Sequence, residues 1–209
     1  MEDGPNRYTN LFRWMVKNKI FISISSILVI FSLILIAFNN MQKIDEEKDM
    51  AVSFEKMVEF LQTEKYFEAI EIAETIQKTK SNSEYKNLSG LLLAQLLIFN
   101  NQEVEAEDIL LSIIKTKGDL KLNQVATVRL IRLYISQNEY AKAHEIAKKN
   151  KVTLPTDSFR EILADLEANK GNHEIAYRLY EELIMQARGS GQSPELFILK
   201  KNNLNKPEK

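Results

Sequence analysis

The sequence predicts an all-α protein with a single N-terminal transmembrane helix, an α-solenoid of about four degenerate helical hairpins and a C-terminal capping helix. Three observations lead to this prediction. Residues 20–38 form an uninterrupted uncharged run, and a pattern of apolar and small residues recurs four times after it. The chain of 209 residues contains only six glycines and four prolines, which is too few for a β-rich protein with many tight turns.

The first element is the run IFISISSILVIFSLILIAF at residues 20–38. As a helix, it extends for about 28 Å, close to the hydrocarbon thickness of a bilayer. A cleaved signal peptide has a shorter apolar core followed by small residues, whereas Ala37-Phe38-Asn39 is a poor cleavage site. A buried core helix is expected to show a polar stripe on one face, and this run, with four serines as its only polar residues, has none wide enough. We therefore expect a membrane anchor at residues 20–40, in contact with the lipid bilayer.

Charged residues on either side of the anchor predict its orientation. The flanking basic residues are Arg13, Lys17 and Lys19 before the run and Lys43 and Lys48 after it. The two lysines after the run are mixed with four acidic residues, so the basic excess lies on the N-terminal side. Because basic flanks stay in the cytoplasm, we expect residues 1–19 to be a cytoplasmic tail and residues 41–209 to form an extracytoplasmic domain.

Composition and spacing argue against nucleic-acid binding and against catalysis. The chain has 28 basic and 29 acidic residues, whereas phosphate binding requires a basic surface. It has no cysteine, and its two histidines, His144 and His173, lack metal-ligand spacing. The stretch Gly189-Ser190-Gly191 lacks the lysine of a phosphate loop. We expect no nucleic-acid partner, no cofactor, no metal site and no catalytic residue.

Four segments after the anchor share one skeleton of spaced residues. The first two skeleton residues are four apart and lie near the end of a first helix. The third follows six residues after the second and begins a second helix. An alanine follows three residues later, and the last skeleton residue comes four residues after the alanine. The four skeletons are Lys56, Phe60, Tyr66, Ala69 and Ala73; Leu93, Leu97, Glu103, Ala106 and Leu110; Leu130, Tyr134, Tyr140, Ala143 and Ala147; and Leu163, Glu167, His173, Ala176 and Tyr180. Residues four apart share a helix face, and the alanine is expected where two helices cross closely. The alternative is a set of unrelated amphipathic helices in which alanine recurs by chance.

Turn residues support the hairpin interpretation. Glu64, Asn101, Asn138 and Gly171 stand five residues before the four alanines. Three of them are Asn or Gly, the residues that best adopt the left-handed conformation at a helix end. The expected hairpins cover residues 49–79, 84–116, 121–149 and 157–187, and the anchor helix is expected to run on through Asn40 to Gln62. A final helix is expected to begin at Ser193-Pro194-Glu195 and to cover the end of the stack.

The hairpins resemble the tetratricopeptide repeat. The best match is Tyr140-Ala141-Lys142-Ala143 after Gln137-Asn138-Glu139, with Pro155 at the usual closing place. The next best is Gly171-Asn172-His173-Glu174-Ile175-Ala176. The first and second units depart from the pattern, with Lys56 at an apolar position and Glu103 where an aromatic residue is usual.

A second resemblance covers nearly the whole chain. A basic N-terminus, one membrane span and degenerate hairpins together look like the YfgM-like family, the ancillary subunit of the SecYEG translocon. The segments that carry the match are YKNLSGLLLAQ at 85–95, VRLIRL at 128–133, LADLEANKG at 163–171 and LKKNNL at 199–204. The resemblance implies a non-enzymatic scaffold at the bacterial inner membrane. Its implied partners are Sec translocon subunits, periplasmic chaperones or exported polypeptides.

Stacked hairpins curve with their first helices on the concave side, and this predicts a partner-binding strip. The expected strip residues are Leu91, Gln95, Val128, Arg132, Glu161 and Asp165. Such a strip suits an extended peptide or a partner helix. The alternative is that the final helix fills the groove. Two other possibilities also stay open: a scaffold role in another envelope machine, such as cell division or cell-wall synthesis, and a homo-oligomer formed through the long helix after the span.

Overall fold

The structure is a computed structural model that describes residues 14–80, 83–116 and 119–204. The chain divides into two compact units, Met1–Asp49 and Met50–Lys209. The first unit holds most of the helix α2 (Lys19–Gln62), whose remaining residues belong to the second unit. The predicted boundary after residue 40 concerns the membrane and stays a prediction.

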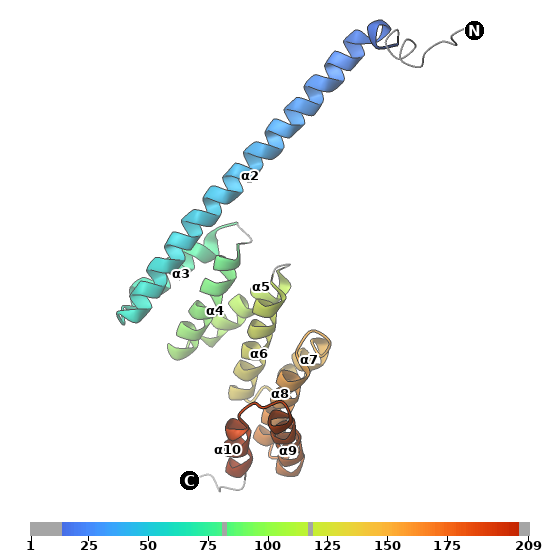
Figure 1. The fold of residues 1–209 in the computed structure, drawn as a ribbon. Helices are drawn as coiled ribbons and strands as arrows, with labels where there is room; N and C mark the ends of the chain where they lie inside the picture. Colours follow the sequence, from blue (N-terminus) through green and yellow to red (C-terminus); the bar gives the residue numbers. More distant parts are fainter. Residues whose placement is uncertain (1–13, 81–82, 117–118, 205–209) are drawn as a thin grey trace, which may run out of the picture. The chain divides into compact units, whose positions relative to one another are not determined.

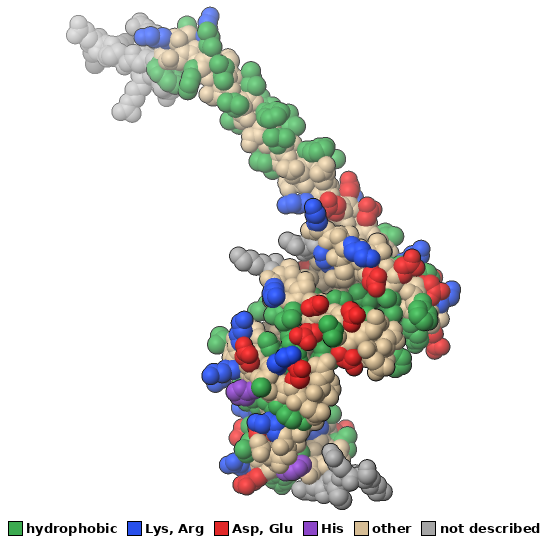
Figure 2. Space-filling model, turned by 180° about the vertical axis from the view of Figure 1, so that it is seen from behind, with side chains coloured by type: hydrophobic (Ala, Val, Ile, Leu, Met, Phe, Trp, Pro, Cys, Tyr) green, Lys and Arg blue, Asp and Glu red, His purple; other side chains and the backbone are tan. Residues whose placement is uncertain are grey.

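The first unit is an exposed apolar helix. Within the described residues, α2 is the one helix that is long and apolar enough to cross a membrane. Figure 2 shows hydrophobic side chains along its N-terminal stretch. The hydroxyl groups of Ser23 and Ser25 donate to the carbonyl oxygens of Lys19 and Phe21 at 2.8 and 2.9 Å, which satisfies these polar groups inside the helix. A helix of this kind is typical of a membrane anchor or a signal sequence.

The second unit contains the predicted helical hairpins, and this confirms the all-α stacked architecture. After the end of α2, the helices follow one another along the stack (Figure 1). They are α3 (Tyr66–Lys78), α4 (Glu84–Phe99), α5 (Glu103–Lys115), α6 (Leu120–Ser136), α7 (Tyr140–Lys149), α8 (Thr156–Asn169), α9 (His173–Gly189) and α10 (Glu195–Asn203). The side chains of Ser83 and Asp119 accept hydrogen bonds from backbone N–H groups at the starts of α4 and α6.

The four predicted turns share one backbone geometry. Glu64, Asn101, Asn138 and Gly171 have φ values of 58°, 58°, 60° and 82°. At each turn, the next N–H donates back to a carbonyl five residues earlier, at 2.8–2.9 Å. This pattern satisfies carbonyl groups at the helix end. Glu64 therefore adopts the same left-handed conformation as the others, although its side chain disfavours it.

The four predicted alanines are fully buried. Ala69, Ala106, Ala143 and Ala176 each have 0% exposure, as expected where helices cross closely. Two other skeleton positions differ from the expectation. Lys56 is exposed, and the next residue, Met57, takes the buried place at 0%, because the apolar side of this helix is shifted by one residue. Leu163 is likewise only half-buried, since its neighbours Ile162 and Ala164 face the core.

The first helices of the hairpins lie on the inside of the stack. Helix α4 contacts α6 and α6 contacts α8, whereas among the described residues the second helices α5, α7 and α9 do not approach one another as closely. The stack therefore curves toward the first helices. Helix α10 packs on α9 in the way that α8 packs on α7 and α6 packs on α5. Helix α10 begins at Glu195, one residue later than the expected N-cap at Ser193 implies. The N–H of Glu195 donates to Ser193 Oγ at 3.4 Å.

Candidate partner-binding surface

The six predicted strip residues all lie on the inner helices, but they differ in exposure. Gln95 and Arg132 are exposed, whereas Val128, Glu161 and Asp165 are half-buried. Leu91 departs from the expectation, because it is a core residue with only 5% exposure. It is covered because α6 packs on α4 here, and Arg129 of α6 donates to its carbonyl oxygen at 2.6 Å. Partner binding by these six residues stays a prediction.

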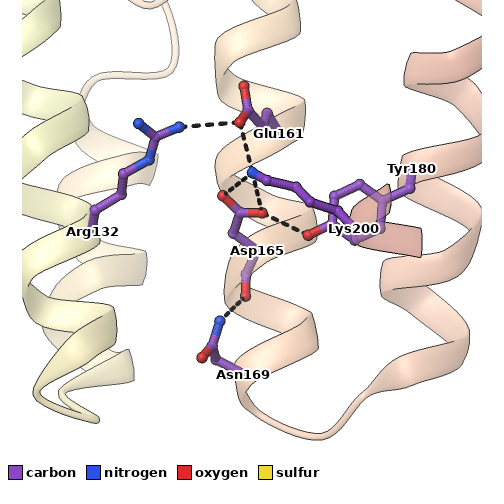
Figure 3. Close-up of polar contacts among 6 residues, drawn as sticks. All are labelled: Arg132, Glu161, Asp165, Asn169, Tyr180 and Lys200. Carbon is purple, nitrogen blue, oxygen red and sulfur yellow. Dashed lines mark hydrogen bonds and ion pairs between the residues drawn. The ribbon is translucent and has the colours of Figure 1, made fainter. Parts of the chain in front are cut away.

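At the C-terminal end, the strip is crossed by a network of ion pairs (Figure 3). Lys200 Nζ of α10 lies 2.7 Å from Glu161 Oε1 and 2.8 and 2.9 Å from the two carboxylate oxygens of Asp165. Arg132 of α6 reaches the same Glu161 oxygen at 3.1 Å. The hydroxyl of Tyr180 donates to Asp165 Oδ1 at 2.6 Å. Two cations therefore balance two carboxylates. We call these five residues the paired cluster.

Four of the five residues of the paired cluster are largely removed from water, whereas the side chain of Arg132 is 51% exposed. The side chains of Glu161 and Asp165 are 18% and 16% exposed, and that of Lys200 is 25% exposed. Burial, followed by the hydrogen bond to Asp165, raises the pKa of Tyr180 above its ordinary value. Because every charged group in the cluster has an opposite partner, the arrangement is typical of a structural link that holds α10 against α8.

The strip is open between α4 and α6. A hollow of about 280 Å³ is lined there by residues that include Gln95, Ile98, Arg129 and Arg132. Arg129 is half-buried, and burial lowers the pKa of its guanidinium. In the described part of the chain, no carboxylate lies within ion-pair distance of Arg129. A desolvated cation without a counter-charge favours an incoming anion.

An apolar pocket adjoins this hollow. It measures about 510 Å³ and lies between the start of α3 and the end of α4. Its apolar lining residues are Tyr66, Phe67, Ile70, Leu96, Ile98 and Phe99. Phe67 and Phe99 are 86% and 83% exposed, although large aromatic side chains are usually much more buried. Gln95 and Ile98 line both the pocket and the hollow, so the two are adjacent. We call them together the open groove.

Sequence reasoning missed Lys200, Arg129 and the exposed aromatic residues. Lys200 lies 35 residues after Asp165, which is close to the spacing of the repeats. If the final helix is treated as the first helix of a fifth repeat, Lys200 therefore takes the position that Asp165 has in α8. Arg129 stands next to the skeleton residue Leu130 and gave no separate signal. Phe67 and Phe99 flank the turns of the first two hairpins, where apolar residues are easily assigned to the core.

No site for a metal emerges in the residues that the structure describes. There, no group of three or more His, Asp or Glu side chains is placed to hold an ion. His173 begins α9 and His144 lies within α7, and both are exposed. The expectation that the chain is not an enzyme stays a prediction, and the groups described above suit binding more than bond-making chemistry.

Comparisons with known proteins agree with this architecture. A family model described as a tetratricopeptide repeat-like domain matches residues 13–206. A crystal structure of nearly identical tetratricopeptide-like repeats, provisionally assigned to a kinesin light chain of Podosopora anserina, is similar with a TM-score of 0.51. The two chains are 17% identical, and the match covers 75% of this chain and 94% of that one. At this identity the likeness concerns the fold alone. No curated protein matches the chain.

Proposed function

We propose a function from one premise: the chain belongs to the family of tetratricopeptide repeat-like domains, whose model matches residues 13–206. The protein is a tetratricopeptide-like scaffold for interactions with other proteins. We infer that it is anchored in the bacterial inner membrane as an accessory subunit of the Sec translocon. In this role its repeat domain holds periplasmic chaperones or exported polypeptides near the channel.

One observation carries the proposal: the apolar helix and the repeat domain are joined in a single element. Helix α2 extends from the apolar stretch to Gln62, and its last turns supply the fully buried Met57 to the repeat core. Signal peptidase needs an accessible small-residue site after the apolar core, and here residues of a continuous helix follow that core. This supports a retained anchor over a cleaved signal sequence. The family match also begins before the apolar stretch.

The Sec assignment depends on the resemblance of four sequence segments to the YfgM-like family. Its support from the chain itself is an open groove on the inner helices of the repeat domain. An accessory subunit beside a translocation channel meets polypeptide segments that are still unfolded, and a groove of this kind suits such segments. The proposal therefore assigns partner binding to the inner strip and membrane attachment to residues 20–40.

Crosslinking in native membranes tests the assignment. Because the chain has no cysteine, single-cysteine variants such as Gln95→Cys and Val128→Cys give crosslinks from one known position. Recovery of translocon subunits or exported chains supports the proposal. Recovery of only cell-division or cell-wall synthesis proteins would overturn it in favour of another envelope machine. Val152→Cys is the matched control, since Val152 is 97% exposed, lies in the connection between α7 and α8 and is not a strip residue.

Because the chain has no cysteine of its own, single-cysteine variants also test the orientation of the chain in the membrane. Val152→Cys places a thiol on the repeat domain, and Asn6→Cys places one in the N-terminal tail. In spheroplasts, a membrane-impermeant maleimide is expected to label the first variant and to label the second only after lysis. The reverse pattern contradicts a periplasmic repeat domain. The intact mass of the chain extracted from membranes should also include residues 1–19.

A further inference from the structure

We propose that the open groove binds an extended internal segment of a partner protein that carries a large apolar side chain and, a short distance along, an acidic side chain. The apolar side chain enters the pocket between α3 and α4, and the carboxylate pairs with Arg129 and Arg132 between α4 and α6. This inference rests on the proposed function, because it names the kind of segment that the scaffold recognises.

The pocket supplies the apolar part of the recognition. Its lining contains three aromatic side chains, of which Phe67 and Phe99 are more than four-fifths exposed. Contiguous exposed apolar surface on a folded domain marks a binding site more often than chance. Ile70 and Leu96 complete its walls. Burial of one Leu or Phe side chain there removes apolar surface from water and so favours binding.

Gln95 lies where the two parts of the groove meet. It is exposed and lines both the pocket and the hollow, and its side-chain amide makes no hydrogen bond to the residues that the structure describes. Its amide both donates and accepts hydrogen bonds. An extended segment that crosses from the pocket to the hollow presents backbone N–H and C=O groups to this amide. Gln95 therefore fits a peptide backbone, whatever the partner's sequence at that point.

The two arginines supply the charged part. Arg129 is half-buried, and within the described residues it has the carbonyl of Leu91 as its partner and no carboxylate. Arg132 pairs with Glu161, but Lys200 also holds the same Glu161 oxygen, at 2.7 Å against 3.1 Å. Arg132 can therefore turn to a ligand without leaving Glu161 unpaired. Two guanidinium groups at one hollow favour a carboxylate, which they can hold by charge-assisted bonds.

The ligand is a segment from a partner and not the chain's own end. Residues 205–209 read Asn-Lys-Pro-Glu-Lys and contain no large apolar side chain for the pocket. The N-terminal tail lies on the far side of the anchor in sequence, and its flank is basic. An internal segment fits better than a chain terminus, because the inner strip continues past Arg132 to α8 and α10, where a segment can run on.

Synthetic peptides test the inference on the full chain in nanodiscs. The probes are short labelled Gly/Ser peptides that contain one Phe or Leu and one Glu at varied short spacing, each paired with a peptide in which Gln replaces Glu. Fluorescence anisotropy is expected to show that the best Glu peptide binds about tenfold more tightly than its Gln counterpart, as the loss of a charge-assisted hydrogen bond implies. Equal binding of both members of every pair overturns the inference, as does a lack of binding.

Variants of the protein locate the binding site. Arg129→Met together with Arg132→Gln is expected to remove the preference for Glu, and Phe67→Ser together with Phe99→Ser is expected to weaken binding of both peptides about tenfold or more. The phenylalanines are so exposed that these changes leave the core intact, which circular dichroism checks. Peptide binding that is unchanged in either double variant contradicts the assignment to the open groove.

Matched controls separate this inference from the proposed function. Arg178→Gln removes an exposed arginine from α9, and Val152→Ser removes an exposed apolar side chain; both should bind the peptides as the parent chain does. Crosslinking to translocon subunits is measured on the same variants. If crosslinks persist while no peptide binds, the inference fails and the scaffold role stands. If peptides bind but translocon crosslinks are missing, the Sec assignment fails and the groove stands.

Discussion

The two ends of the inner strip use charged residues in different ways. In the paired cluster, Lys200 and Arg132 face Glu161 and Asp165 at 2.7–3.1 Å, and each charge has an opposite partner. In the open groove, Arg129 is desolvated without a carboxylate in the described part of the chain. Removal of one member of a compensated cluster leaves a charge unpaired and destabilises the fold, whereas an uncompensated cation beside an apolar pocket is typical of a surface that meets a ligand. The two ends of the strip therefore differ in whether their charges are already paired, and Arg132, which lines the hollow and pairs with Glu161, belongs to both.

The largest expected effect concerns the paired cluster. Asp165→Ala removes the carboxylate that accepts from both Lys200 and Tyr180. This leaves a largely buried hydroxyl without its acceptor and one carboxylate for two cations, so we expect a loss of about 2–3 kcal/mol in the free energy of unfolding. Chemical denaturation of the full chain in detergent measures it.

Asp108→Ala is the control for this change. Asp108 is exposed on α5, and its replacement should alter the free energy of unfolding by less than about 0.5 kcal/mol. Limited proteolysis should also cut Asp165→Ala near α10 earlier than the parent chain, because the link from α8 to α10 is weakened. If both variants unfold at the same denaturant concentration, the paired cluster is not a structural link.

Alkaline pH provides a second test of the paired cluster. Tyr180 has a pKa above its ordinary value of 10.0, because it is buried and donates to Asp165, with Glu161 also nearby. Its folded pKa is raised, so its contribution is complete below pH 10 and is lost as the pH rises from there toward the folded pKa. At pH 7, Tyr180→Phe should lose about 1.5 kcal/mol, the value of one hydrogen bond to a charged acceptor.

The difference between the parent chain and Tyr180→Phe should then shrink above pH 10. Only the parent chain can ionise this phenol, and it does so more readily when unfolded. Ionisations that are common to both chains cancel in the difference. Parallel denaturation curves from pH 7 to pH 11 measure it, and a difference that is constant across this range contradicts the argument.

The repeat positions could be predicted from the sequence because each depends on local chemistry. Alanine at a helix crossing and Asn or Gly at a left-handed turn are required by close packing and backbone sterics, and all four alanines and all four turns lie where they were expected. The prediction failed at Lys56, which is exposed although its skeleton position is usually apolar. A shift of one residue along a helix turns the apolar side by about 100°, and only the neighbouring helix shows that Met57 is the buried residue.

The site was less predictable, because it depends on contacts between hairpins. The spacing correctly placed Gln95 and Arg132 on the exposed inner side. It could not show that Lys200 would reach back to α8, or that Leu91 would be covered by α6. Pairing distances across helices decide which charges are compensated, and a single sequence contains no measure of them. The exposure of Phe67 and Phe99 beside the turns could not be predicted for the same reason, because it depends on which neighbouring helices cover them.

The turns at the two ends of the repeat domain give a second comparison. Glu64 has a φ of 58°, whereas the last hairpin has Gly171 at 82°. Glu64→Gly should raise the free energy of unfolding by up to about 1 kcal/mol, since glycine adopts this conformation without a steric penalty. Gly171→Ala should lower it by about 1 kcal/mol. No atom lies within 4 Å of an added Cβ at Gly171, so the loss reflects backbone conformation and not a clash. Thermal unfolding of the two variants measures the sign of each change in the free energy of unfolding. If both changes have the same sign, the two turns do not share the left-handed conformation assigned to them.

The smallest expected effect concerns Arg129 in the open groove. Arg129→Met removes a desolvated cation and keeps a long apolar side chain against α4. It loses one hydrogen bond to the Leu91 carbonyl, but it also relieves the cost of keeping an unpaired charge away from water, so the free energy of unfolding should change by less than about 0.5 kcal/mol. Lys200→Met makes the same exchange in the paired cluster. It leaves Glu161 and Asp165 without their shared cation and should cost about 2 kcal/mol. Denaturation of both variants compares the two ends directly. Equal losses contradict the distinction between them, whereas a loss confined to Lys200→Met shows that stability depends on the paired cluster and leaves Arg129 available for a ligand.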